Sequence, residues 1–443
     1  MKLKIEVIYL LNIFMVLSVG VPLVVPIFPF LISGLLLSNA YADDFHYRSV
    51  LIGERGASLG GAYIAISDDP SGVFYNPAGI VFGFENYISG SANTYTSSQT
   101  VYKQVAPGQD YTYNSQSFSP SFIGFSQSVG KQKFAFAIIV PSYDLLDQDD
   151  LLSSISTKVD RANTLLRRYY NQNITYSGGP AYSVALGERL SFGVSLLVYV
   201  KTNVVINTQL IEDNPLPNGK YFIQESYLKE NYYGLTPKLG FQFMPSPKLS
   251  LGFTAKKNYN LSGGTTIRTL SNKLDASGVP APKTGGFTDD FTTNVYDLKT
   301  GVISPWELGL GSAYFFSKSL LVAADIIYYT ADSAYNQSSV VPTLNWSLGA
   351  EWYMTDALAL RFGLFSNAAN TPAVDSTLTN QSTHVDLYGG SFGISILKSG
   401  SSFTLGTSYS SGIGKGQAFA NSTTIQEVSQ SQLSVYLAGS YQL

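Results

Sequence analysis

The stretch Leu358-Ala-Leu-Arg-Phe-Gly-Leu364 places a bulky apolar residue at every second position, with Ala, Arg or Gly between them. Side chains that alternate with a period of two lie on opposite faces of a β-strand. The same alternation recurs in residues 134–140, 249–255 and 433–443. In each run one face is uniformly bulky and apolar, and the other is small or polar. This pattern predicts strands whose apolar side faces lipid and whose polar side faces a lumen.

The spacing of the connections indicates how many strands there are. Tight turns are predicted at residues 130–132, 187–189, 245–247, 317–319, 355–357 and 398–400. Longer polar stretches lie between them, at residues 103–113, 142–173, 206–226, 261–290, 333–341, 370–383 and 414–430. This alternation predicts an all-β fold, a transmembrane antiparallel β-barrel of about 14 strands, because bacterial barrels have an even strand number and closure pairs every backbone group. A soluble β-sandwich is the alternative.

Composition excludes several classes of protein. The 443 residues include no cysteine and two histidines, His46 and His384, and the formal net charge is -3. Without cysteine the chain cannot be a disulfide scaffold or hold a thiolate zinc site, and two distant histidines leave little for an imidazole site. The charge balance offers no basic face for nucleic acid. We therefore expect no cofactor, no metal ion and no nucleic-acid partner.

The first 42 residues have the features of a secretory signal peptide. Lys2 and Lys4 precede an apolar run over about residues 7–37, and Ala40-Tyr41-Ala42 ends it. A basic start, an apolar middle and an A-x-A end predict cleavage before Asp43. The alternative is a retained membrane anchor, because the run is long enough to span a bilayer. We expect an exported protein, located in the bacterial outer membrane as a multi-pass β-barrel.

Residues 53–80 combine a Gly-rich run, an acidic pair and an Asn-Pro-Ala triplet. This segment resembles the opening of the FadL/TodX family of outer-membrane transporters for hydrophobic compounds. Weaker similarity is spread over the strand stretches 249–263, 305–309 and 348–372. The resemblance implies a small hatch (residues 43–86) inside the barrel (residues 87–443). The hatch residues that match the family pattern are Gly60, Gly61, Asp68, Asp69, Asn76, Pro77 and Ala78.

The resemblance also implies a function. It predicts passive uptake of long-chain fatty acids or aromatic hydrocarbons through loop capture, lumen binding and hatch-gated release, by a monomer that is embedded in outer-membrane lipid. Family likeness further implies a sideways exit at a kink in an early strand, for which Pro120 and Gly124 are candidates because Pro and Gly disturb strand pairing. The alternative is a non-specific porin, or a structural or adhesive barrel that has kept the hatch.

Residues 142–173 depart from the strand pattern, because their apolar residues recur at steps of three and four. This period predicts an amphipathic helix, with Asp149 and Asp150 near its start and Arg167 and Arg168 near its end, as the helix dipole favours. In the family, such loop helices form a groove that first captures the ligand. The predicted groove residues are Leu151, Leu152, Ile155, Val159 and Leu166. The alternative is a helix that packs only on neighbouring loops.

A few charged residues alternate out of phase with bulky neighbours and are therefore assigned to the lumen face. Facing lipid, each would cost about 2 to 4 kcal/mol at mid-membrane. A basic residue among them can meet a fatty-acid carboxylate, but the similar number of acids favours a structural ion-pair network. The predicted lumen charges are Lys238, Lys256, Arg361, Glu307, Glu351 and Asp325.

Two other motifs carry less weight. Gly56-Ala-Ser58-Leu-Gly60 fits the G-x-S-x-G pattern of hydrolases, but that motif needs a strand-turn-helix elbow and a partner histidine. Asp147, Asp149 and Asp150 can ligate Ca²⁺, although such a run is more often a solvated loop. We therefore predict that the protein is not an enzyme.

Overall fold

The computed structural model describes residues 45–156, 161–212, 221–274, 290–297, 304–333, 339–378, 381–418 and 423–443. The predicted signal peptide lies outside these residues. Within them, no helix is long and apolar enough to cross a membrane.

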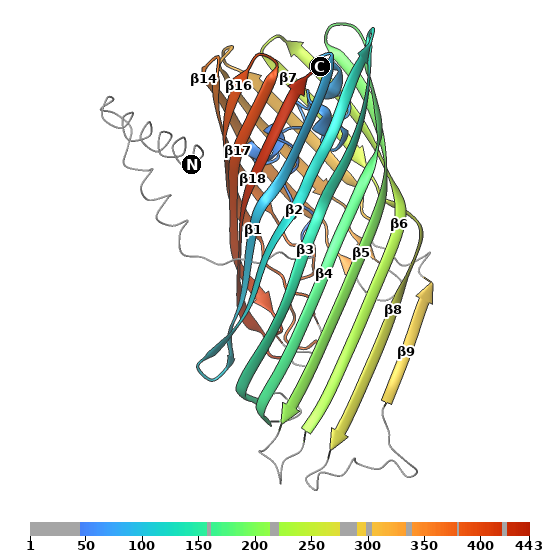
Figure 1. The fold of residues 1–443 in the computed structure, drawn as a ribbon, viewed down its shortest axis with the longest axis vertical. Helices are drawn as coiled ribbons and strands as arrows, with labels where there is room; N and C mark the ends of the chain where they lie inside the picture. Colours follow the sequence, from blue (N-terminus) through green and yellow to red (C-terminus); the bar gives the residue numbers. More distant parts are fainter. Residues whose placement is uncertain are drawn as a thin grey trace, which may run out of the picture. The chain divides into compact units, whose positions relative to one another are not determined.

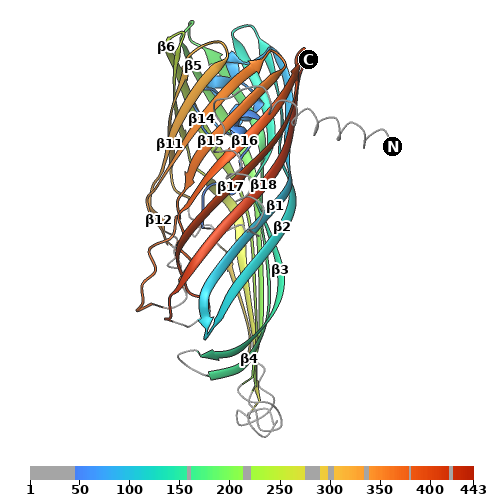
Figure 2. The same ribbon diagram turned by 90° about the vertical axis from the view of Figure 1, so that its left-hand side faces the viewer.

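Long antiparallel strands close into a barrel (Figures 1 and 2). The first strand, β1 (Asn86–Ala106), pairs with the last, β18 (Gln426–Gln442), and β5 pairs with β6, so fourteen strands form a closed ring. The others are β2 (Gln109–Val129), β3 (Gln132–Ser156), β4 (Arg161–Ala185), β5 (Leu190–Glu212), β6 (Tyr221–Ser246), β7 (Leu249–Lys256), β10 (Glu307–Phe315), β11 (Leu320–Tyr329), β14 (Thr343–Thr355), β15 (Leu358–Asn367), β16 (Leu387–Lys398) and β17 (Ser401–Gly416). The predicted fold class is confirmed.

The exposure of side chains along β14 is inverted relative to a soluble protein. Leu344, Trp346 and Leu348 are exposed, whereas Asn345 and Ser347 between them are buried. The polar residues therefore face the lumen and the apolar ones face outward, as in a barrel that is surrounded by lipid. β10, β11 and β15 show the same alternation.

We expect Leu348→Arg to lower the free energy of unfolding from lipid vesicles by about 2 to 4 kcal/mol, because the charge would enter hydrocarbon near the middle of the apolar band. Urea titration of vesicle-reconstituted protein measures this difference. Leu378→Arg, on a leucine that is exposed in the connection between β15 and β16, is the control, with an expected cost near zero. Equal costs for the two variants would contradict a lipid-facing Leu348.

The six predicted tight turns join β2–β3, β4–β5, β6–β7, β10–β11, β14–β15 and β16–β17. Because the strands run up and down in sequence, these turns all lie at one end of the barrel, here named the turn end; the opposite end is the loop end. Strands β3 to β6 have 25, 25, 23 and 26 residues, far more than the 9 to 11 that a tilted strand needs to span a bilayer. They extend at the loop end together with β8 (Tyr259–Leu274) and β9 (Asp290–Asp297) (Figure 1). The two-residue strands β12 (Asp332–Ser333) and β13 (Ser339–Val340) pair separately.

The predicted helix within residues 142–173 is wrong. These residues form the loop-end arms of the β3–β4 hairpin, which are paired from Ser142↔Thr175 to Ser156↔Arg161. The acidic and basic pairs that suited a helix dipole are cross-strand partners instead, Asp149 with Arg168 and Asp150 with Arg167. Opposite charges on facing strands stabilise a hairpin just as they stabilise a helix, so the sequence pattern did not distinguish the two.

Residues 45–85, here called the N-terminal segment, lie inside the barrel toward the turn end (Figures 1 and 2). They contain the short helices α3 (Arg55–Ser58), η2 (Pro70–Val73) and η3 (Gly79–Phe82). Most of residues 52–80 are buried, and Leu59, Tyr63 and Ile80 pack against wall residues in one hydrophobic cluster.

Candidate functional site

Glycines on the inner face of the barrel wall make room for the N-terminal segment. A Cβ atom on Gly363 would collide with the backbone of Leu59 and Gly60, and one on Gly240 would collide with the side chain of Asn76. The other wall glycines in this set are Gly193, Gly252, Gly311, Gly349 and Gly393, which face Pro77, Ile64, Ala65, Leu59 and Ser58. The small inner face of the strands is therefore the surface that receives the segment.

The Asn-Pro-Ala triplet fastens the segment to three strands. Asn76 donates from Nδ2 to Ile64 O at 2.8 Å and to Phe241 O at 3.2 Å, and its Oδ1 accepts from Ala78 N at 3.0 Å. The carbonyl of Ala78 accepts hydrogen bonds from Ser183 Oγ at 3.1 Å and Ser191 Oγ at 2.8 Å. These contacts join the triplet to β4, β5 and β6.

The remaining predicted hatch residues shape the segment itself. Gly60 and Gly61 have φ of 65° and 84°, values that favour glycine. Asp69 caps η2 by accepting from Ser71 N at 2.7 Å, and both Asp68 and Asp69 accept from Tyr63 Oη at 2.9 Å.

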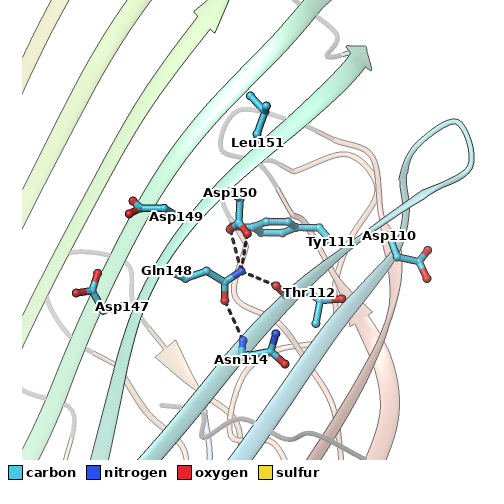
Figure 3. A pocket seen from close by; sticks show the side chains of 9 residues that line it. All are labelled: Asp110, Tyr111, Thr112, Asn114, Asp147, Gln148, Asp149, Asp150 and Leu151. Carbon is cyan, nitrogen blue, oxygen red and sulfur yellow. Dashed lines mark hydrogen bonds between the residues drawn. The ribbon is translucent and has the colours of Figure 1, made fainter.

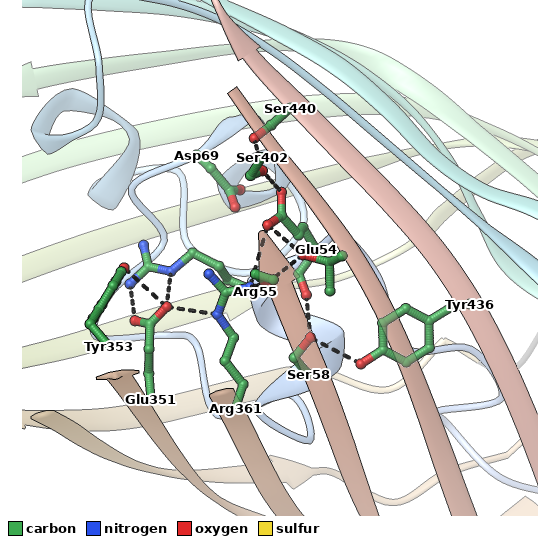
Figure 4. A network of polar contacts seen from close by, with 12 residues as sticks. Glu54, Arg55, Ser58, Asp69, Glu351, Tyr353, Arg361, Ser402, Tyr436 and Ser440 are labelled. Carbon is green, nitrogen blue, oxygen red and sulfur yellow. Dashed lines mark hydrogen bonds and ion pairs between the residues drawn. The ribbon is translucent and has the colours of Figure 1, made fainter. Parts of the chain in front are cut away.

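An ion-pair network locks the segment to the opposite wall (Figure 4). Glu351 on β14 lies 2.6 Å from Arg55 Nη2 of the segment and 2.7 Å from Arg361 Nε of β15. Arg361 Nη1 also lies 3.3 Å from Glu54 Oε1, and Arg55 pairs with Asp68. Sequence analysis missed Glu54 and Arg55, although both charges interrupt an otherwise small and apolar run.

A second cluster of predicted lumen charges lies on neighbouring strands. Glu307 is 3.2 Å from Lys238 Nζ and 2.5 Å from Lys256 Nζ, and Lys238 Nζ also donates to Phe74 O at 2.6 Å. Asp325 accepts from the backbone of Tyr63 at 2.7 Å and Ile64 at 2.8 Å. Each predicted lumen charge thus pairs with another charge or with the N-terminal segment.

Ser58 has none of the contacts of a nucleophile. Its Oγ donates to Glu54 O at 2.8 Å and accepts from Tyr436 Oη at 3.0 Å. His384 Nδ1 lies instead 2.7 Å from Thr371 O. Ser58 thus fastens α3 to β18.

The wall has a seam between β2 and β3. Their backbone ladder ends at Phe122↔Ile139, yet β2 continues to Gln109 and β3 to Ser156 without further pairing between them. Pro120 and Pro141 lie just beyond the last pair, and proline cannot donate to a ladder. Pro120 therefore lies where the pairing is disturbed, whereas Gly124 pairs regularly with Ala137.

Side chains bridge the seam in place of a backbone ladder (Figure 3). Gln148 of β3 accepts from Asn114 N at 2.9 Å and donates to Thr112 O at 2.6 Å. Tyr111 Oη donates to Asp150 Oδ2 at 2.8 Å, and Ser115 Oγ donates to Leu145 O. Two strands joined by side chains separate more easily than two strands joined by a full ladder.

A cavity of about 610 Å³ lies along this seam, lined by Asp110, Tyr111, Thr112, Asn114, Asp147, Gln148, Asp149, Asp150 and Leu151. Its aspartates are engaged: Asp147 and Asp149 lie 3.7 and 3.9 Å from Arg168, and Asp110 lies 2.7 Å from Lys103 Nζ. The Lys103 hydrogen bond lowers the pKa of Asp110. Among the described residues, no group of three or more His, Cys, Asp or Glu side chains is placed to hold a metal ion.

Buried apolar and aromatic side chains gather at the loop end beside the seam. Tyr102, Val105, Ala106, Tyr111, Val385, Leu387, Ala418 and Val428 form one cluster, against which Tyr113 packs. The Arg167 guanidinium carbon lies 5.4 Å from the ring centre of Tyr111 and 5.1 Å from that of Tyr169. Tyr111 belongs to both this aromatic cluster and the seam cavity, so the two regions adjoin.

The predicted groove residues do not share a helix face. Leu151 and Leu166 are direct cross-strand partners that are 69% and 47% exposed. Leu152 pairs with Leu165 and Ile155 with Ala162, while Val159 lies outside the described residues. A capture role for these residues stays a prediction.

No protein-family model and no curated protein sequence matches this chain. Solved structures do match. A FadL homologue of Pseudomonas aeruginosa has a TM-score of 0.61 at 14% identity, covering 90% of this chain and 99% of its own. The toluene transporters TodX of Pseudomonas putida and TbuX of Ralstonia pickettii have TM-scores of 0.59 and 0.55 at 13% and 12% identity, each covering 88% of this chain and 98% of its own.

These structural matches assign the chain to a class of protein by its fold. The chain folds as a transmembrane β-barrel similar to barrels of the FadL type. At such identities the similarity establishes the fold alone.

Proposed function

We propose that this protein is an outer-membrane channel for the passive uptake of hydrophobic compounds. The observation that carries the proposal is the seam between β2 and β3, which adjoins the aromatic cluster at the loop end and begins where the apolar band of the outer wall ends. In bacterial barrels the short turns face the periplasm, so the loop end is extracellular. The solved structures of similar fold include transporters of toluene, which supports the same class of cargo.

The filled lumen argues against the porin alternative. A porin needs a water-filled path along the barrel axis. Here the N-terminal segment occupies the turn end and is held by hydrogen bonds and ion pairs on several strands. A hydrophobic ligand has a different route, because it can leave sideways where the β2–β3 ladder ends at Phe122 and Ile139, next to the exposed Ile123 and Ile138 of the apolar outer face.

The driving force is the burial of apolar surface. A ten-carbon chain gains about 0.8 kcal/mol per buried methylene, or roughly 8 kcal/mol in all. We propose that the ligand first meets exposed apolar side chains such as Leu151 and Leu166 and then binds at the aromatic cluster. Exit follows through the seam, or past the N-terminal segment once Gly60, Gly61, Asp68, Asp69, Asn76, Pro77 and Ala78 release it. The channel acts as a monomer and performs no chemistry.

The cargo is a fatty acid or an aromatic hydrocarbon. The mutual pairing of Lys238 and Lys256 with Glu307, and of Arg361 with Glu351, supports a structural role for these lumen charges. On that basis the apolar part of the ligand supplies most of the affinity.

Locking the seam is expected to block uptake. The chain has no native cysteine, so Asn114→Cys with Gln148→Cys gives a pair that a bismaleimide can join across the seam. Uptake of labelled laurate or toluene by cells that express the cross-linked protein is expected to fall roughly tenfold or more, since the linked strands cannot part. The matched control is Asn114→Cys with Gln99→Cys, its direct cross-strand partner on β1, which joins β2 to the neighbour with which it is paired at this position.

Full uptake by the locked protein would place the exit elsewhere. If neither laurate nor toluene binds the detergent-purified wild-type protein, the structural or adhesive alternative is favoured, because that alternative needs no hydrophobic site.

A further inference from the structure

A row of oxygen-bearing side chains crosses four strands on the inner face of the barrel. Asp144 on β3, Asn173 on β4, Asn203 on β5 and Glu230 on β6 are successive cross-strand partners. Direct partners in an antiparallel sheet have Cβ atoms about 4.5 to 5.5 Å apart, so neighbouring side chains can share one ligand. Asn173 lies twelve residues (185 minus 173) from the turn end of β4, which places the row on the loop side of the apolar band.

The two carboxamides in this row have buried oxygens without donors. Asn173 and Asn203 are 1% and 7% exposed. Neither Oδ1 atom has a hydrogen-bond partner among the described residues, and the same holds for Oδ1 of Asn171, two residues along β4 on the same face. A buried acceptor that has no hydrogen bond costs about 1 to 3 kcal/mol.

The orientation of one amide is fixed by its neighbour. Asn203 Nδ2 donates to Glu230 Oε2 at 3.1 Å, so the opposite end of the amide is the oxygen. Tyr232 Oη also donates to Glu230 Oε1, at 3.3 Å. Glu230 therefore holds Asn203 with its acceptor turned away from the carboxylate and along the row.

We propose that this row binds a divalent hard cation, with Ca²⁺ the best fit. Calcium takes carboxylate and carboxamide oxygens at 2.3 to 2.6 Å, and the row offers both kinds without a sulfur or imidazole ligand. A bound cation gives the orphan oxygens of Asn173 and Asn203 a partner, with the Asp144 carboxylate beside them on β3, while Glu230 orients Asn203 from β6. It also ties together β3, β4 and β5 where they rise above the membrane. This cation row is distinct from the aspartates of the seam, two of which lie near Arg168.

Titration of the detergent-purified full chain with Tb³⁺, followed by competition with Ca²⁺, tests the proposal. Tyr232 contacts Glu230 and sensitises Tb³⁺ emission at the row. One saturable site that Ca²⁺ displaces is expected. Asn173→Leu should weaken Ca²⁺ binding roughly tenfold or more, and Asn173→Asp, which keeps the oxygen and adds a charge, should strengthen it.

The control is Asn231→Leu, which removes a carboxamide next to Glu230 but on the outward face and should leave the affinity unchanged. Folding of each variant is checked by the heat-dependent gel migration of intact barrels. Absence of saturable binding, or equal affinity in folded Asn173→Leu and wild type, would overturn the proposal and leave the row as hydrated lumen wall. Neither result bears on hydrophobic uptake, which is measured separately.

Discussion

Glu351→Ala is expected to lower the free energy of unfolding by about 3 to 5 kcal/mol, because removing one member of a buried ion pair leaves uncompensated charge. Glu351 is 1% exposed and contacts two guanidinium groups, Arg55 at 2.6 Å and Arg361 at 2.7 Å. Its loss leaves Arg55 of the N-terminal segment and Arg361 of the wall with less counter-charge than before. Urea titration of the reconstituted protein measures the change.

Arg168→Ala provides the contrast. Arg168 also faces two carboxylates, Asp147 at 3.7 Å and Asp149 at 3.9 Å, but its side chain is 59% exposed. Exposed pairs contribute about 0 to 1 kcal/mol, so this variant should unfold nearly as the wild type does. Similar losses in the two variants would mean that the Glu351 network is hydrated and does not lock the segment to the wall.

Gly363→Ala is expected to open an aqueous path that the wild type lacks. The added methyl group would collide with the backbone at Leu59 and Gly60, and backbone cannot rotate away as a side chain can. Overpacking of this kind costs about 1 to 3 kcal/mol. The N-terminal segment avoids this cost by moving away from the wall at Gly363. Planar-bilayer recordings should show stable conductance steps for the variant and none for the wild type.

Gly390→Ala is the matched control for that measurement. Gly390 lies on the neighbouring strand β16, and a Cβ atom there meets its nearest atoms at 3.4 Å or more, which is ordinary contact. This variant should remain closed. Equal conductance in the two variants, or no conductance in either of them, would show that the segment is not held in place by its fit against Gly363.

The fold was largely predictable because its signals are local. Alternation along 358–364 and the six tight turns each depend on a few consecutive residues, and lipid imposes an apolar outer face on every strand. The lumen charges were predictable for the same reason, since Arg361 and Glu351 break the alternation in phase with the inner face.

The candidate site was less predictable because it depends on register. Asp149 and Arg168 are nineteen residues apart (168 minus 149), and only the pairing of β3 with β4 makes them neighbours. The leucines around them fit a helix and a hairpin equally well. Pro120 did indicate disturbed pairing, but Pro141 on the facing strand and the bridging Gln148 were visible only once β2 and β3 were placed side by side.

Quenching of the native tryptophans by brominated lipids tests most directly whether lipid surrounds the apolar face. The chain has 3 tryptophans, and all of them, Trp306, Trp346 and Trp352, point outward with 43%, 37% and 44% exposure. In reconstituted vesicles we predict strong quenching by lipids brominated in the acyl chains and weak quenching by acrylamide in the buffer. Strong acrylamide quenching with no effect of the brominated lipids would contradict a membrane barrel.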